Sequence, residues 1–136
     1  MSNLEQTLSI IKPDAVERNL DEKIKSIFLT NGFKILKEKK IQIEKSEAEK
    51  FYKVHETKPF YNDLCAYLSS GPIVVMILEK VNAVLDNREL MGATNPNDAK
   101  EGTIRKKYGI SIDKNSVHGS DSVENAKIEI DFFFKD

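Results

Sequence analysis

The sequence predicts an α/β protein of the α+β kind, a ferredoxin-like split βαβ sandwich in which helices cover a four-stranded antiparallel sheet. Short β-branched or continuously apolar segments alternate along the chain with segments of helical periodicity, which gives two βαβ units. A length of 136 residues suits one domain with its own core. We therefore expect a single domain over residues 1–136, with its helices on one face of the sheet. A doubly wound parallel sheet is the weaker alternative.

The first half of the chain contains clear strand and helix boundaries. Its expected elements are a strand at 7–11, a helix at 21–31, a strand at 33–43, a helix capped by Ser46 with Glu49, and a short helix ending at Leu68. The first strand closes at Lys12-Pro13, and Asn31-Gly32 stops the first helix. In the second strand the apolar residues Phe33, Ile35, Ile41 and Ile43 share one alternation phase, and lysines separate them. We therefore expect this strand to have one solvated face.

The second half has a different pattern, with one long polar segment. Its expected elements are a strand at 73–78, a helix at 82–91, a polar loop at 92–109, a short strand within 110–118, and a helix at 121–134. The strand at 73–78 is continuously apolar, as a central strand covered on both faces would be. Asp121 and Glu124 form a cap pair for the last helix.

Composition excludes several classes of protein. The net charge of −1 argues against a dedicated nucleic-acid binder, which usually carries a basic excess. No apolar run approaches the roughly 20 residues that span a bilayer, and residues 1–19 lack the features of a signal peptide. With Cys65 as its only cysteine, the chain forms no internal disulfide, so we expect a cytoplasmic protein and a buried, unreactive Cys65.

His118 is the most informative candidate for chemistry. The chain has no glycine-rich phosphate loop of a known pattern and no zinc motif, so a phosphate site would need side chains and a helix N-terminus. His118 lies between an apolar strand and a capped helix, and a neutral imidazole is a nucleophile at pH 7. Glu129 lies about 90° from the centre of the final helix's apolar stripe, so it could lean inward and hold the other ring nitrogen. An ordinary loop histidine is the alternative, and local sequence alone favours it.

Two cations are further candidates. Arg88 shares a helical stripe with Val81, Val84 and Leu85, which predicts that it faces the core and needs an anionic partner. The alternatives are an arginine that reaches solvent at the helix end and a structural ion pair. Lys12, at the end of the first strand, could meet a phosphate, although a solvated lysine is commoner there.

The remaining candidates are weaker on spacing alone. Thr94 and Arg105 lie in the long polar loop, and loops of that length are often functional, but Arg105 also fits a charged surface run. Tyr52 and Phe60 flank a helix break. Spacing favours core packing for both, and the functional alternative is a hydroxyl near the nucleophile and a ring for a nucleobase. His55 has no assigned role.

Four segments resemble motifs of the nucleoside diphosphate kinase family. They read TLSIIKPDAVERN, NRELMGATNP, EGTIRKKYG and NSVHGSDSVENA, and they recur in the family's order over essentially the whole chain. The N-x-x-H-G-S-D motif is highly specific, above all beside K-P-D and G-A-T-N-P. The resemblance implies an enzyme that moves the γ-phosphoryl of a nucleoside triphosphate, typically ATP, to a nucleoside diphosphate. It also implies a ping-pong mechanism through a phosphohistidine.

The same resemblance implies a role for each matching residue. His118 would accept the phosphoryl group, with Ser120 and Glu129 supporting it. Phe60 would stack on the base, opposite Ile112. The positions around the phosphates and sugar are matched by Lys12, Tyr52, Arg88, Thr94, Arg105 and Asn115.

The resemblance further implies a cofactor and an assembly. Mg²⁺ would be bound mainly through the nucleotide phosphates, with Asp121 reaching it at most through water. The family implies dimers assembled into a homotetramer or homohexamer. We expect nucleoside di- and triphosphates as partners and no membrane.

The chain departs from the family pattern at four places. Arg18-Asn19-Leu20-Asp21-Glu22 stands where R-G-L-x-G is frequent, Lys58 stands for a frequent arginine, and Glu101 stands for a frequent proline. The sequence also ends soon after its last helix, without a longer tail. Lys58 would replace a bidentate contact by a point charge, so nucleotide affinity could differ.

Two rival functions stay open on sequence grounds. A ferredoxin-like regulatory module that binds a small ligand without turnover fits the fold and the charge balance. It leaves the joint presence of Lys12, Arg88, Arg105, Asn115 and His118 unexplained. A catalytically silent family member that acts as a scaffold usually lacks the histidine or an arginine, and here all are present.

Overall fold

The computed structural model describes residues 4–112 and 114–134, with the side chain of residue 54 excepted. The ends of the expected single domain, and residue 113 within its last expected strand segment, lie outside that range. The elements are β1 (Leu4–Ile11), α1 (Pro13–Glu17), α2 (Asp21–Thr30), β2 (Lys34–Ile41), α3 (Lys45–Phe51), α4 (Tyr61–Leu68), β3 (Ile73–Val81), α5 (Ala83–Met91), α6 (Ile104–Tyr108), β4 (Val117–Gly119) and α7 (Val123–Phe133), with short 3-10 helices at Lys53–His55 and Pro96–Asp98.

The four strands form one antiparallel sheet in the order β2-β3-β1-β4, which confirms the ferredoxin-like arrangement and excludes the parallel alternative. β1 lies between β3 and the short edge strand β4. Its register places Ile10 opposite His118 and Ser9 opposite Gly119. The sheet therefore fixes the backbone of His118 through a strand that is buried in the middle of the molecule.

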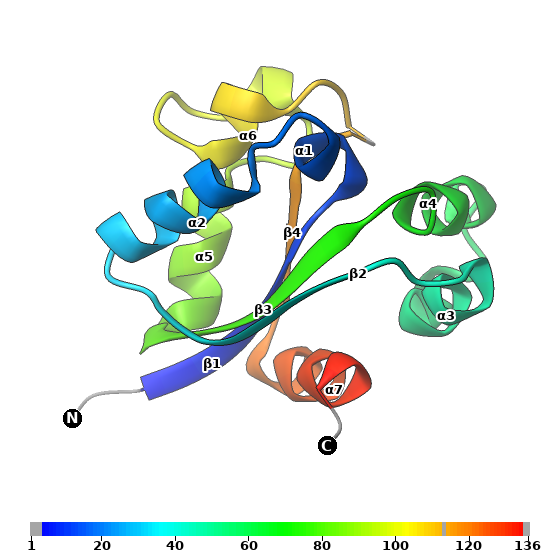
Figure 1. Ribbon diagram of the computed structural model, residues 1–136, viewed down its shortest axis with the longest axis horizontal. Coiled ribbons are helices and arrows are strands. Elements are labelled where there is room, and N and C mark those ends of the chain that lie inside the picture. The colour runs from blue at the N-terminus through cyan, green and yellow to red at the C-terminus, as the bar shows by residue number, and fades with distance from the viewer. Residues whose placement is uncertain (1–3, 113, 135–136) are drawn as a thin grey trace.

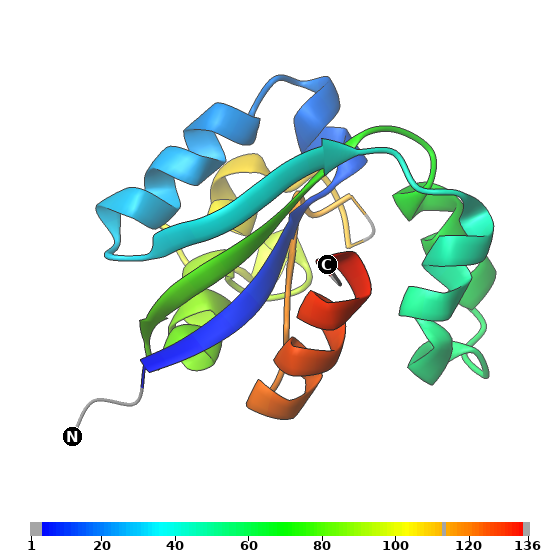
Figure 2. The same cartoon turned by 60° about the horizontal axis from the view of Figure 1, so that its bottom comes forward.

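Helices cover both faces of the sheet, so the expectation of a single covered face was wrong. Figures 1 and 2 show α1, α2, α5 and α6 on one side and α3, α4 and α7 on the other. The reason is visible in β3, where Val74, Met76 and Leu78 belong to one apolar core while Ile73 and Val75 belong to the other. A strand with apolar side chains on both sides needs cover on both sides.

β2 reaches both cores through a β-bulge. Its register against β3 shifts between Ile35 and Lys37, which leaves Leu36 as the extra residue. Because side chains alternate along a strand, one extra residue exchanges the faces. Phe33 and Ile35 therefore pack in the core under α2, whereas Ile41 and Ile43 pack in the core under α3 and α4. The alternation pattern predicted that these four residues share one face. That prediction was wrong, because the bulge places the two pairs on opposite faces.

Several helix ends differ from the expected ones. α3 begins at Lys45, and its capping pair is Glu44 with Glu47, whose carboxylate accepts the Glu44 N–H at 3.2 Å. The last helix is capped by the Ser122 hydroxyl, which accepts the Asn125 N–H at 3.1 Å. The polar loop at 92–109 contains α6, a short helix that its charged sequence concealed. Among the described residues, no helix is both long and apolar enough to cross a membrane.

Candidate active site

His118 stands on β4 with one ring nitrogen held by a carboxylate. Its Nε2 lies 3.1 Å from Oε1 of Glu129, and the Ser120 hydroxyl donates to the same oxygen at 2.7 Å. Ser120 is itself tied to β1, because its backbone N–H donates to the Leu8 carbonyl at 3.2 Å. The His118 and Glu129 side chains are 21% and 19% exposed, so the ring is reachable and the pair is partly screened. Glu129 is placed by α7, which packs against β1.

Two aromatic rings line the imidazole of His118. The Phe51 ring meets it edge-on with centroids 5.4 Å apart, and the Tyr52 ring does so at 6.4 Å. Burial raises the pKa of Tyr52, and the negative charge of Glu129 raises it further. The Tyr52 hydroxyl therefore stays protonated and is available as a hydrogen-bond donor. Sequence spacing alone had favoured core packing for Tyr52, and its 5% exposure agrees with that as well.

Lys12 is buried and tied to the loop before His118. Its ammonium donates to Oδ1 of Asn115 at 2.9 Å, and only 6% of the residue is exposed. The Asn115 amide donates in turn to the Thr94 carbonyl at 3.0 Å. These bonds bring together the end of β1, the segment after α5 and the segment before β4. The solvated strand-end alternative for Lys12 is thus excluded.

Arg105 connects the long loop to the strand of His118. Its two terminal nitrogens donate to the Gly92 carbonyl at 3.0 Å and to the Val117 carbonyl at 2.8 Å, while its buried Nε has no partner in the described part of the chain. Burial lowers the pKa of Arg105 to about 10, and the nearby charge of Arg88 adds to that shift. A buried, incompletely bonded guanidinium beside a second one is a site that favours an anion.

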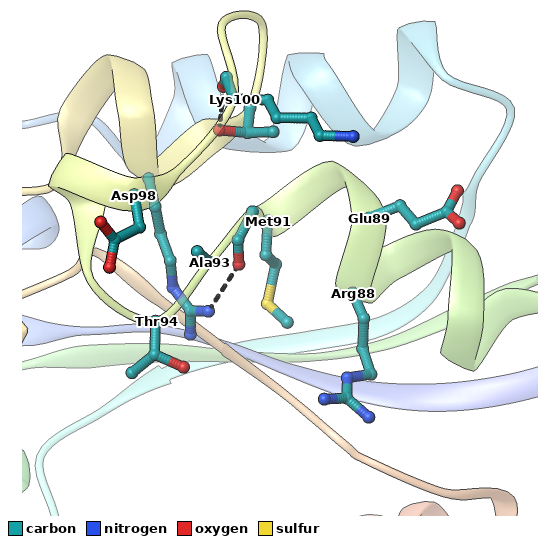
Figure 3. Close-up of a pocket in the computed structure, with 10 residues that line it drawn as sticks. Arg88, Glu89, Met91, Ala93, Thr94, Asp98 and Lys100 are labelled. Atoms are coloured by element: carbon teal, nitrogen blue, oxygen red, sulfur yellow. Dashed lines mark hydrogen bonds between the residues drawn. The ribbon is translucent and has the colours of Figure 1, made fainter.

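A cavity of about 650 Å³ opens beside these two arginines. We call it the arginine pocket; its lining includes Arg88, Thr94, Asp98, Lys100 and Arg105. In Figure 3 the side chains of Arg88 and Thr94 extend toward the same side of the pocket, and Glu89 points away. His118 is not part of the lining, and the hydrogen bond from Arg105 to the Val117 carbonyl joins the pocket to the strand of His118.

The predicted direction of Arg88 was wrong. The buried residues of α5 are Ala83, Val84, Asn87 and Met91, and Arg88 is exposed at the rim of the pocket. The stripe used for the prediction included Val81, which belongs to β3, so a helical wheel did not apply to it. An exposed arginine needs no buried partner, and it remains available to an incoming anion.

Phe60 and Ile112 are both exposed. Phe60 is 48% exposed and Ile112 is 53% exposed. Lys58 lies with its ammonium 5.7 Å from the centroid of the Phe60 ring, and the His55 ring lies 6.3 Å from it. Burial lowers the pKa of His55, followed by the positive charge of Lys58.

The departure at Arg18–Glu22 is accommodated by the fold. Asn19 occupies a left-handed conformation with φ of 59°, which asparagine tolerates better than most residues and which suits the glycine frequent in the family. Arg18 donates to the Tyr108 carbonyl at 2.6 Å and so joins α1 to α6. No group of three or more His, Cys, Asp and Glu side chains suited to a metal ion occurs within the described ranges.

Sequence reasoning missed two groups near the site. Phe51 contacts the imidazole of His118, but its spacing was that of an ordinary core residue. Asp14 and Ser116, which are buried, and the half-buried Tyr67 form a polar cluster next to Lys12. Their only local signal was the acidic residue inside K-P-D, because the cluster joins parts of the chain that are far apart.

Comparisons with known proteins agree with this geometry. The model of the nucleoside diphosphate kinase family matches residues 5–136. The nucleoside diphosphate kinase of Nitratiruptor sp. is 60% identical over 131 residues, which cover 96% of each chain, and that of Campylobacter jejuni strain RM1221 is 59% identical over 132 residues, 97% of this chain and 96% of the relative.

Solved structures are similar throughout. The crystal structure of the Aquifex aeolicus nucleoside diphosphate kinase superposes with a TM-score of 0.94 at 39% identity, covering 96% of this chain and 95% of that one. The enzyme from Encephalitozoon cuniculi gives 0.94 at 37% identity, with 97% and 90% covered. A family match over nearly the whole chain, close relatives and the same fold lead to one conclusion: this chain belongs to the nucleoside diphosphate kinase family.

Proposed function

We propose that His118 carries the phosphoryl group when this enzyme, a nucleoside diphosphate kinase, transfers the γ-phosphoryl of a nucleoside triphosphate to a nucleoside diphosphate. The observation that supports this most strongly is the contact between His118 Nε2 and the Glu129 carboxylate at 3.1 Å. An ionised carboxylate only accepts hydrogen bonds, so Nε2 must carry the ring proton. Nδ1 then holds the lone pair and is the nucleophile.

Each half-reaction follows from that lone pair. In the first, Nδ1 of His118 forms a bond to the γ-phosphorus, and the bond from phosphorus to the bridging oxygen breaks, with its electron pair leaving on the nucleoside diphosphate. In the second, a terminal oxygen of the acceptor diphosphate attacks the phosphorus, and the P–N bond breaks and returns its pair to Nδ1. One site serves donor and acceptor in turn, so ping-pong kinetics follow.

The surrounding side chains supply alignment and charge, which phosphoryl transfer chiefly requires. We assign Lys12 and Arg105 to the phosphates because both cations are buried beside the strand of His118. Arg88 and Thr94 contribute from the rim of the arginine pocket. Asn115, which orients the Lys12 ammonium, is assigned to the sugar and phosphates, and Tyr52 is assigned as a protonated hydroxyl donor.

Phe60 and Ile112 are assigned to the nucleobase. Both are exposed apolar side chains, so their surfaces are available to a ligand. Stacking uses the flat face that every base has, so it predicts broad tolerance of bases. Lys58 lies close to the Phe60 ring and adds a point charge there.

Enzymes of this family use a divalent metal bound to the nucleotide, and we propose Mg²⁺. Among the described residues no acidic cluster offers a protein cage, and the Asp121 carboxylate already accepts the Asn125 amide at 2.6 Å. With so few carboxylates on offer, the site fits a cation that keeps several water ligands and is held mainly by phosphate oxygens. The metal would neutralise phosphate charge, while the chain's own residues orient the nucleotide.

Assembly and compartment are proposals of the same kind. We propose a homotetramer or homohexamer of dimers, as the family implies, and light scattering on the purified protein decides between the two. We propose that the enzyme acts in the cytoplasm on nucleoside di- and triphosphates, because its one free cysteine, Cys65, is buried and suits a reducing compartment.

The decisive experiment is labelling with γ-labelled ATP, followed by transfer of the label to a nucleoside diphosphate. We expect an acid-labile, base-stable phosphoprotein that GDP or CDP discharges, and no label in His118→Ala. A folded wild-type protein that takes no label contradicts the proposal and favours a regulatory ligand-binding module. Label that forms but is not discharged contradicts the second half-reaction.

A further inference from the structure

The loop that enters β4 contains a strained turn immediately before the nucleophile. We call residues 115–117 the Ser116 turn. The Asn115 carbonyl accepts the Val117 N–H at 2.9 Å, and Ser116 between them has φ of 76°. A three-residue turn with a positive central φ is rare and strained, and a residue with a Cβ disfavours that conformation. Something in the surrounding structure must therefore hold Ser116 in place.

The Asp14 carboxylate is the group that reaches the Ser116 side chain. The Ser116 hydroxyl donates to Asp14 Oδ2 at 3.3 Å, and Arg18 lies 3.3 Å from the same oxygen and 3.4 Å from the hydroxyl. The other carboxylate oxygen accepts the Tyr67 hydroxyl, and that hydroxyl accepts the Asp14 N–H at 2.8 Å. Asp14 and Ser116 are 5% and 0% exposed, so the contacts are protected from water.

The position of this cluster gives it consequences for the proposed chemistry. Asn115, on one side of Ser116, accepts the Lys12 ammonium at 2.9 Å. His118, two residues on the other side, pairs with Ile10 in the sheet. The Lys12 N–H also donates to the Ser116 carbonyl at 2.8 Å. A change in the Ser116 turn therefore moves the lysine partner and the nucleophile relative to each other.

We propose that Asp14 is a positioning residue, which through the Ser116 hydroxyl holds the left-handed turn that aligns Asn115 and Lys12 with His118. Tyr67 and Arg18 fix the carboxylate from α4 and from the end of α1. Arg18 also donates to the Tyr108 carbonyl, so the cluster joins α6, the helix of Arg105, to the same point. This inference rests on the proposed role of His118 and extends it to residues that do not touch the substrate.

Two substitutions of Ser116 test whether its hydroxyl acts by holding the positive φ of the turn or in some other way. Ser116→Ala keeps the Cβ that disfavours a positive φ and removes the hydroxyl that holds the turn, so we expect the first-order rate of enzyme phosphorylation at saturating ATP to fall about tenfold or more, as for small misplacements of reacting groups. Ser116→Gly also removes the hydroxyl, but glycine adopts a positive φ without strain. We therefore expect Ser116→Gly to recover most of the wild-type rate.

A third substitution connects the effect to the carboxylate. Asp14→Asn replaces the charged group that accepts from Ser116, Arg18 and Tyr67 by a neutral amide with one acceptor oxygen, so we expect it to slow phosphorylation of the enzyme. In the Ser116→Gly background the turn no longer needs the hydrogen bond from the serine hydroxyl to hold it. Asp14→Asn must therefore reduce the phosphorylation rate by a smaller factor in that background than in the wild type. Thermal unfolding of every variant shows whether it is folded at the assay temperature.

Asn82 offers a matched control. It is a second left-handed residue with φ of 57°, is exposed, and stands before α5. Asn82→Ala and Asn82→Gly place the same two residues at a positive-φ position outside the Ser116 turn, and we expect both to keep the wild-type phosphorylation rate.

The outcomes are distinct. A wild-type rate in Ser116→Ala overturns the inference, as does a Ser116→Gly variant that is as slow as Ser116→Ala. If Asp14→Asn reduces the phosphorylation rate by the same factor in the wild type and in Ser116→Gly, the inference is also overturned, because Asp14 then acts through other contacts. Absence of label in the wild-type protein defeats the proposed function itself, whereas normal labelling of the wild type with these results defeats the tether alone.

Discussion

Nε2 of His118 lies 3.1 Å from the carboxylate of Glu129, across the junction between an edge strand and the helix that follows it. The carboxylate also accepts the Ser120 hydroxyl at 2.7 Å, so its orientation is fixed independently of the ring. An ionised carboxylate accepts hydrogen bonds only, so this arrangement favours the tautomer with the ring proton on Nε2. It is the same principle by which a buried aspartate selects the tautomer of a catalytic histidine in other enzymes.

Replacing Glu129 by glutamine tests the importance of that tautomer. A glutamine amide can turn its NH₂ group toward Nε2, which favours the ring proton on Nδ1 and removes the nucleophilic lone pair. We expect phosphorylation of Glu129→Gln to slow by at least about tenfold, with the fold retained. Rapid-quench measurement of label incorporation at saturating ATP provides the number. Wild-type rates in Glu129→Gln contradict a role for the carboxylate in selecting the tautomer.

Phe60 offers a test of base recognition. Its ring is 48% exposed, and stacking of a base on an aromatic ring contributes about 1–3 kcal/mol. We expect Phe60→Ala to raise KM by about tenfold for ADP, GDP and CDP alike, since stacking does not distinguish the bases. Leu29→Ala is a matched control, because Leu29 is also exposed but lies on α2. A selective loss with one base would show that Phe60 contributes specificity beyond stacking.

The two arginines of the pocket predict a separation of affinity from stability. Burial and the charge of Arg88 lower the pKa of Arg105 to about 10, so the two guanidinium groups repel each other when no anion lies between them. Arg88→Gln removes that repulsion, and we expect a thermal midpoint no lower than that of the wild type. Loss of a charged hydrogen bond should weaken ADP binding by roughly tenfold to a hundredfold. Scanning calorimetry gives the thermal midpoint, and titration calorimetry gives the affinity for ADP.

Lys106→Gln is the control for charge alone. Lys106 neighbours Arg105 in the sequence, is exposed, and does not line the arginine pocket. We expect its substitution to leave ADP affinity within about twofold of the wild type, because exposed charges are well screened. Equal losses from Lys106→Gln and Arg88→Gln would mean that general positive charge, rather than the pocket, attracts the nucleotide.

Much of this site could be predicted from the sequence because its residues follow regular elements. Glu129 lies on an α7 long enough for a helical wheel to place it at the boundary, where it is 19% exposed. Arg88 shows the opposite case, since the pattern that predicted its direction crossed from β3 into α5. The extra residue Leu36 leaves no mark on composition or spacing, so the bulge that exchanges the faces of β2 was not predictable either.

The polar cluster around Asp14 is a tertiary feature of another kind. Its partners Tyr67 and Ser116 are 53 and 102 residues away in the sequence. A local pattern contains no information on contacts of that separation, and each residue alone fits a surface position. Only the assembled sheet, which places the end of β1 beside the start of β4, brings them together.

His55 predicts a dependence of stability on pH. Burial lowers its pKa in the folded state below the ordinary value of 6.5, with Lys58 adding to the shift and Asp121 and Glu129 opposing it. On acidification the unfolded chain takes up the proton first, so stability that is present above pH 6.5 is lost as the pH falls through the folded pKa. We expect His55→Gln to flatten the dependence of the thermal midpoint between about pH 7 and pH 5.

The thermal midpoints of His55→Gln and of the wild type are compared at each pH in the same buffers. The two proteins differ at residue 55 alone, so the difference between their pH profiles reports on His55. An unchanged pH profile in His55→Gln would mean that the imidazole has the same pKa in the folded and unfolded chains. A steeper profile would mean that folding raises its pKa.

Gly119 lies next to His118, and a substitution there tests how closely α5 packs on β4. A Cβ at position 119 would lie 2.4 Å from Asn87 Nδ2 and 2.7 Å from Met91 Cε, both closer than ordinary contacts. Asn87 is fully buried, so it cannot move aside easily. We expect Gly119→Ala to destabilise the protein by about 1–3 kcal/mol, as overpacking usually does, and to slow phosphorylation because β4 must shift with His118.

Asn87→Ala should partly rescue that variant. The Asn87 amide has no hydrogen-bond partner in the described part of the chain, so its removal forfeits no bond there and relieves the closest contact. Urea unfolding and rapid-quench labelling of the two single variants and the double variant form a cycle. We expect the double variant to be more stable and faster than the sum of the single effects. Simple additivity would mean that Asn87 and residue 119 do not press on each other, and that His118 is placed by β1 alone.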